Sequence, residues 1–132
     1  MIGVDTNVLV RFFVRDDARQ TSLAHKFMDE RSDSDPAFVS ILVIAELIWA
    51  LGQIYGFDRD RIRATITLLL SSSDVVIERE DIIKGAVTEA TATNADMADT
   101  IIAAVSLNAG CSRIMTFDRD AARHIAAMEL LR

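Results

Sequence analysis

Five acidic side chains fall at the ends of expected strands or in the first two turns of the helices that follow them. They are Asp5, Glu46, Asp96, Asp99 and Asp118. In a parallel α/β sheet the carboxyl ends of the strands share one edge, and ligands bind there. Carboxylates gathered in one crevice raise one another's pKa values unless cations neutralise them. The pattern therefore predicts one or two hard divalent ions, Mg²⁺ or Mn²⁺, able to activate water for attack on a phosphate.

Each acid also has a simpler interpretation. Glu46 is the only charge between Ile41 and Leu51, so burying it would be costly unless it were paired or bound to metal. It could instead point to a solvent edge or pair with an arginine. Asp5 and Asp118 could simply cap the helices that follow them, a common role for aspartate.

Two of the acidic positions leave a choice between neighbouring residues open. Asp96 and Asp99 are three residues apart at the start of one expected helix, so they share a face, but acids also favour a first helical turn through the macrodipole. Asp120 competes with Asp118, although residues two apart point to different sides of a helix. We rank Asp118 above Asp120 because it is nearer the strand end, and the choice between Asp96 and Asp99 stays open at this point.

Strand and helix signals alternate along the whole chain. The sequence predicts strands at 2–4, 37–39, 75–77, 113–116 and 129–131, and helices at 8–14, 18–29, 41–55, 59–70, 79–93, 96–109 and 119–127. This order is typical of an α/β fold whose mostly parallel central sheet of four to five strands is flanked by about seven helices. Residues 1–132 fit one domain, and Trp49 is expected in its core.

Composition narrows the function classes. A formal net charge of -6 argues against a protein that coats nucleic acid by bulk charge, although bound cations would reverse the local sign. No apolar stretch is long enough for a bilayer span, and no secretory signal is recognisable, so a soluble cytoplasmic protein is expected. Cys111 has no disulfide partner, and neither His25 nor His124 forms a zinc-like cluster with it. A metal would be held by oxygen.

Four segments together resemble the PIN-domain ribonucleases, and most closely the VapC-type toxins of bacterial toxin-antitoxin pairs. They are Ile2 to Leu9, Val39 to Leu47, Asp96 to Ala104, and Met115 to Asp120. The resemblance covers essentially the whole chain and implies a three-layer PIN-like fold. It also implies Mg²⁺- or Mn²⁺-dependent endonucleolytic cleavage of RNA.

The resemblance also implies roles for individual residues. Asp5, Glu46, Asp99 and Asp118 would be the catalytic, metal-binding acids, with Asp96 an additional ligand or a supporting group. Polar residues that orient these acids would be Thr6, Asn7, Ser40 and Thr116. A cognate antitoxin and a homodimer are the expected protein partners.

Other functions fit the residues less well. The alternative without catalysis is an inactive PIN-like module that binds RNA or protein, but the chain retains the full set of acids. A phosphatase of the haloacid-dehalogenase type needs an aspartate where Asn7 stands, and no glycine-rich phosphate loop is present. Arg11, Arg15 and Arg19 recur every four residues and could meet RNA phosphates, but a solvated helix face diluted by Asp16 and Asp17 explains them equally well.

Overall fold

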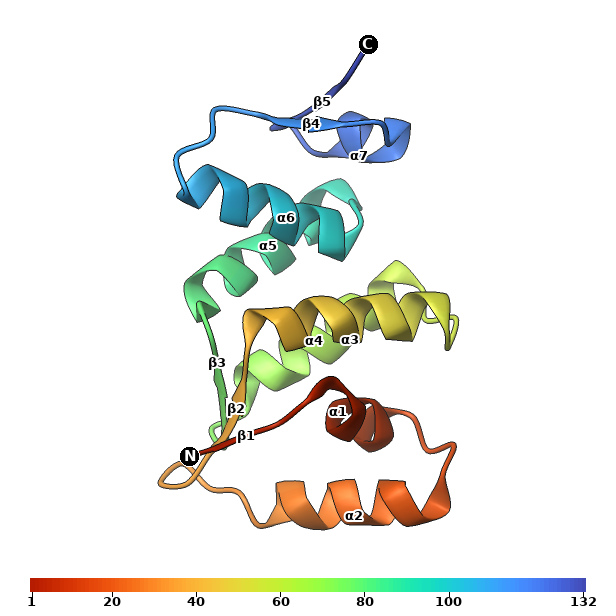
Figure 1. Cartoon of the computed structure of the whole chain (residues 1–132), viewed down its shortest axis with the longest axis vertical. Coiled ribbons are helices and arrows are strands. Elements are labelled where there is room, and N and C mark those ends of the chain that lie inside the picture. Colours follow the sequence, from red (N-terminus) through yellow and green to blue (C-terminus); the bar gives the residue numbers. More distant parts are fainter.

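Helices and strands alternate from one end of the chain to the other (Figure 1). The computed structural model describes residues 1–132. The strands are β1 (Ile2–Gly3), β2 (Ala37–Val39), β3 (Val75–Ile77), β4 (Ile114–Thr116) and β5 (Met128–Leu130). The helices are α1 (Thr6–Phe13), α2 (Ala18–Asp29), α3 (Ile41–Gln53), α4 (Arg59–Ser71), α5 (Glu80–Thr93), α6 (Met97–Asn108) and α7 (Arg119–His124).

Six of the seven helices begin at a polar residue whose side chain accepts a hydrogen bond from a backbone amide in the first turn. These residues are Asp5, Asp17, Ser40, Asp58, Asp96 and Asp118. Such caps satisfy one of the free amides at a helix start. The exception is α5, which follows Arg79 in a left-handed conformation and has no side-chain cap. The expected helices are confirmed, although α7 ends three residues earlier than predicted.

All strand pairs are parallel and the chain has seven helices. These features confirm the predicted α/β class, the parallel pairing and the number of helices. The strands differ from the expectation in one respect, because they form two sheets rather than one. β1, β2 and β3 make a three-stranded sheet, and β4 and β5 make a separate pair. In Figure 1 this pair lies beyond α6 at one end of the molecule, and β1 lies near the other end.

Two hydrophobic clusters match this division. The larger has 17 buried residues and centres on α3, with contributions from α1, α4, α5 and α6; Ile44, Leu47 and Leu51 are fully buried in it. The smaller joins β5 and α7 to Ala95 and Ala103 on and beside α6.

The prediction that Trp49 lies in the core is wrong, since 61% of its surface is exposed on the outer side of α3. An apolar side chain on a very apolar helix does not reveal from sequence which side faces the core. No helix in the structure has the length and apolar character required to cross a membrane.

Candidate active site

The first group of acids joins the start of α1 to the middle of α3. The Thr6 hydroxyl donates a hydrogen bond of 3.2 Å to Oε2 of Glu46, so residues forty positions apart are held together. Asp5, Thr6, Asn7 and Glu46 line one cavity of about 400 Å³ with Tyr55 and Trp49. The expected meeting of Asp5 and Glu46 therefore occurs around this cavity.

Glu46 is exposed, which overturns the argument that its burial demands a metal. The side chain lies on the solvent edge of α3, while the neighbouring Leu47 and Ile48 face the core. The simpler interpretation, that Glu46 points to a solvent edge, is the correct one. What remains in favour of a functional role is its place beside Asp5 and the hydrogen bond from Thr6.

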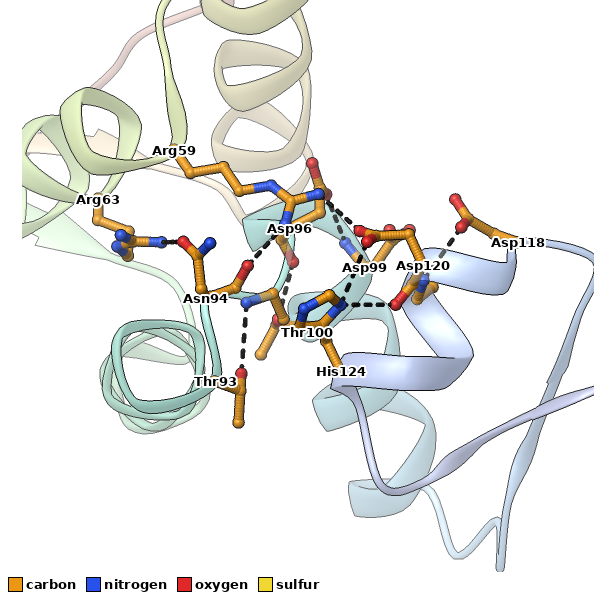
Figure 2. A network of polar contacts seen from close by, with 12 residues as sticks. Arg59, Arg63, Thr93, Asn94, Asp96, Asp99, Thr100, Asp118, Asp120 and His124 are labelled. Atoms are coloured by element: carbon orange, nitrogen blue, oxygen red, sulfur yellow. Dashed lines mark hydrogen bonds and ion pairs between the residues drawn. The ribbon is translucent and has the colours of Figure 1, made fainter.

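The second group of acids lies to one side of Arg59, at the starts of α6 and α7 (Figure 2). The Arg59 guanidinium donates to Oδ2 of Asp120 at 2.7 Å and to the carbonyl oxygen of Asn94 at 2.6 Å. The other oxygen of Asp120 lies 3.2 Å from the His124 ring. Arg59 therefore engages Asp120 through Oδ2, and the His124 ring pairs with Oδ1 only when it is protonated.

Asp99 experiences the charges of this second group most strongly. Burial raises the pKa of the Asp99 carboxyl, the negative charges of Asp96, Asp118 and Asp120 raise it further, and the positive charge of Arg59 opposes them. The hydrogen bond from Arg59 instead lowers the pKa of Asp120. A carboxyl whose pKa is raised by burial and neighbouring acids is a common feature of functional sites, although structural charge networks produce it too.

Three of the candidate acids are bound through one oxygen only. Oδ1 of Asp5, Asp96 and Asp118 each accepts a backbone amide at 3.0–3.1 Å and caps a helix. The capping interpretation of Asp5 and Asp118 is therefore correct for one oxygen of each, and Asp96 is found to cap α6 in the same way. Their Oδ2 atoms make no hydrogen bond within the chain, and neither does the Asp99 carboxylate.

The expected supporting residues make identifiable contacts. Thr6 donates to Glu46, and the Thr116 hydroxyl accepts the amide of Asp118 at 2.9 Å. Ser40 caps α3 and so fixes the helix that carries Glu46. Asn7 lines the cavity beside Asp5 without a hydrogen bond from its side chain.

The single chain does not unite the two groups. Asp5 and Glu46 lie on one side, and Asp96, Asp99 and Asp118 lie on the other with Asp120. No three of the chain's carboxylates, cysteines or histidines are close enough to hold one metal ion. The prediction that one crevice collects every acid is therefore wrong for the single chain, because β4, which precedes Asp118, belongs to a sheet separate from that of β1.

A family comparison covers almost the entire chain. The model of the PIN domain matches residues 2–127. The chain belongs to the PIN-domain family.

A comparison with curated protein sequences gives no match. Among solved structures, the PIN-domain chain is similar to VapC20 of Mycobacterium tuberculosis, described as a toxin that cleaves the sarcin-ricin loop. The two are 20% identical, the similarity covers 93% of this chain and 94% of that one, and the TM-score is 0.47.

Arg59 is the functional neighbour that sequence reasoning missed in this PIN domain. It belongs to α4, yet it pairs with Asp120 on α7, 61 positions later. Only the packing of α4 against α5 and α6 reveals that its charge faces the acids. Arg11, by contrast, pairs with Asp16 at 3.0 Å, so part of its charge is neutralised locally.

Replacing Asp99 with asparagine is expected to stabilise the metal-free PIN domain against unfolding at neutral pH. The folded-state pKa of Asp99 is raised, so its ionisation costs stability in full above that pKa, and the cost disappears as the pH falls towards the unfolded value. Melting temperatures of both proteins in EDTA should differ most near pH 7 and converge in acid. A variant that melts below the wild type at pH 7 would contradict this account.

Proposed function

We propose that the protein is a metal-dependent endoribonuclease and the toxin of a cytoplasmic toxin-antitoxin pair. The observation that carries the proposal is the PIN-domain match over residues 2–127 in a chain that retains acids at every expected position. The cognate antitoxin would cover these acids and block access of RNA. Membership of the family supports the nuclease class, and the acid pattern supports the metal requirement.

The proposed metal ligands are Asp5, Glu46, Asp99 and Asp118, with Asp96 an additional ligand. Carboxylate oxygens are the hard donors that Mg²⁺ and Mn²⁺ prefer, so the type of ligand fits. A bound ion would supply Lewis-acid chemistry for hydrolysis of a phosphodiester. Within one chain, however, the acids stand in two groups, and the complete ligand set requires these groups to come together.

The chain's own residues prepare this set. The α1 and α7 caps fix one oxygen of Asp5 and of Asp118, which orients the other oxygen without occupying it. The Thr6 hydroxyl restrains Glu46 on the exposed edge of α3. The ion pair with Arg59 engages Asp120, which leaves Asp118 the more available acid near the end of β4.

Purified protein is expected to cleave RNA in Mg²⁺ or Mn²⁺ and to stop when EDTA removes the ions. Excess Mn²⁺ should restore cleavage, and the same ion should raise the melting temperature because the native state alone binds it. An inactive PIN-like module would bind RNA in a gel-shift assay and leave it uncut under all these conditions. Cleavage that persists undiminished in EDTA would refute the metal requirement.

A further inference from the structure

The first strand of this chain has an unpaired edge. The amides of Ile2 and Val4 donate to the carbonyl oxygens of Pro36 and Phe38 beside β2, both at 3.0 Å. Successive residues of a strand direct their backbone groups to opposite sides, so the backbone groups of Gly3 face away from β2. No other strand pairs with β1. An open edge of this kind is a template for another strand.

An apolar groove runs beside this open edge. It has a volume of about 650 Å³, and its walls are formed by β1 with parts of α1 and α2, including Val4, Val8, Leu23 and Phe27. Nothing lies within 4 Å of the position that a Cβ of Gly3 would occupy. The groove thus offers apolar walls to side chains of a strand lying against β1.

The separate pair of strands carries the complementary edge. The Ile114 amide donates to the carbonyl oxygen of Ala127, just before β5, at 2.8 Å. The backbone groups of Met115 therefore face away from β5. Met115 is 42% exposed and Phe117, which follows the strand, is 81% exposed. β4 therefore presents unpaired backbone groups and apolar side chains to solvent.

The chain's own packing keeps these two edges apart. α7 and β5 are fixed to α6 by the smaller hydrophobic cluster and to α4 by the ion pair between Arg59 and Asp120. α6 in turn contributes Met97 and Ile101 to the main core. Figure 1 accordingly places β1 and β4 towards opposite ends of the long axis.

The chain exposes more surface than a compact monomer of the same mass. The chain exposes 7651 Å², whereas a compact monomer of 14.6 kDa exposes about 6,900 Å². The excess of roughly 750 Å² is close to the roughly 800 Å² that each partner buries in a stable protein complex. Because the edges lie at opposite ends, two antiparallel copies would satisfy both edges of each chain at once, as a closed two-fold dimer requires.

We propose that β1 of each chain pairs in parallel with β4 of a second copy, so that each carboxylate site is built from two chains. Asp5 and Glu46 of one copy then meet Asp99 and Asp118 of the other, at the shared carboxyl ends of the joined strands. The exchanged strands would complete a five-stranded sheet at each end of the dimer. The assembly of the site rests on the proposed nuclease function, whereas the strand pairing does not.

Cross-linking tests the strand pairing without any activity. In a Cys111→Ser background, Ile2→Cys with Met115→Cys, both at exposed positions, should give a covalent dimer with a short bismaleimide. The matched control joins Val76→Cys on the outer strand β3 with Met115→Cys and should stay monomeric. A cross-link within one chain, or no cross-link at all, would overturn the proposal.

Complementation tests the shared site. Asp5→Asn and Asp118→Asn chains, each inactive alone, are refolded together. Random pairing makes about half of the dimers mixed. Each mixed dimer regains one of its two sites, so about one quarter of wild-type cleavage should return. No recovery beside an active wild type would refute the shared site while leaving the nuclease function standing. A wild type that cuts no RNA would refute the nuclease function, and the cross-linking result would still decide the strand pairing.

Discussion

Replacement of Asp99 with asparagine is expected to lower the rate of RNA cleavage by about 100-fold or more. The change removes one negative charge from the proposed ligand set while keeping the shape of the side chain. A metal ion contributes several kcal/mol to stabilisation of the reaction's charge, and a loss of about 3 kcal/mol corresponds to roughly 100-fold in rate. Initial cleavage rates of a labelled RNA in saturating Mn²⁺ measure the effect, and Asp5→Asn should behave alike.

The matched control for this experiment is Asp33→Asn. Asp33 lies in the exposed loop before β2 and makes no ion pair or side-chain hydrogen bond, so the same chemical change there should leave cleavage intact. Purifying all proteins identically also excludes a contaminating nuclease. Full activity in both Asp5→Asn and Asp99→Asn would remove these acids from the mechanism. Asp99→Asn should lose activity despite its gain in metal-free stability, because a site of like charges is held at a cost in folding energy.

Replacement of Leu47 with alanine is expected to cost about 3 kcal/mol of unfolding free energy and to lower the melting temperature by about 10 °C. Leu47 is fully buried beside Glu46 in the main cluster, so the lost side chain leaves a cavity that its packed neighbours cannot fill. Thermal and urea unfolding followed by circular dichroism measure the loss.

Leu42→Ala is the control for the core substitution, because it makes the same chemical change in the same helix at a side chain that is 72% exposed. A surface substitution of this kind shifts stability by about 0.5 kcal/mol or less. If both variants lost equal stability, the burial pattern of α3 described above would be incorrect.

Features decided by neighbouring residues could be predicted from the sequence. A cap followed by an apolar pattern fixes a helix start locally, so Asp17, Ser40 and Asp58 mark the beginnings of α2, α3 and α4 correctly. The three residues of β2 and of β3 are likewise as expected, since short apolar runs between helices have few other conformations.

Features decided by packing between distant segments could not be predicted. Trp49 and Glu46 sit on a helix that is apolar on nearly every side, and hydrophobicity alone does not show which side the core takes. Arg59 reaches the acids only because α4 packs against α5 and α6. The separation of β4 from β1 also depends on how α6 is held between two clusters, which no local pattern encodes.

Asp5, Asp96 and Asp118 are both helix caps and proposed metal ligands, which affects the choice of substitution. Each carboxylate uses one oxygen to begin a helix, and an asparagine can do the same because its side-chain carbonyl accepts the same amide. Alanine cannot, and its loss of the cap costs about 1 kcal/mol. An alanine substitution would therefore weaken the start of α1, α6 or α7 as well as remove a ligand, and the loss of activity could not be assigned to the ligand alone.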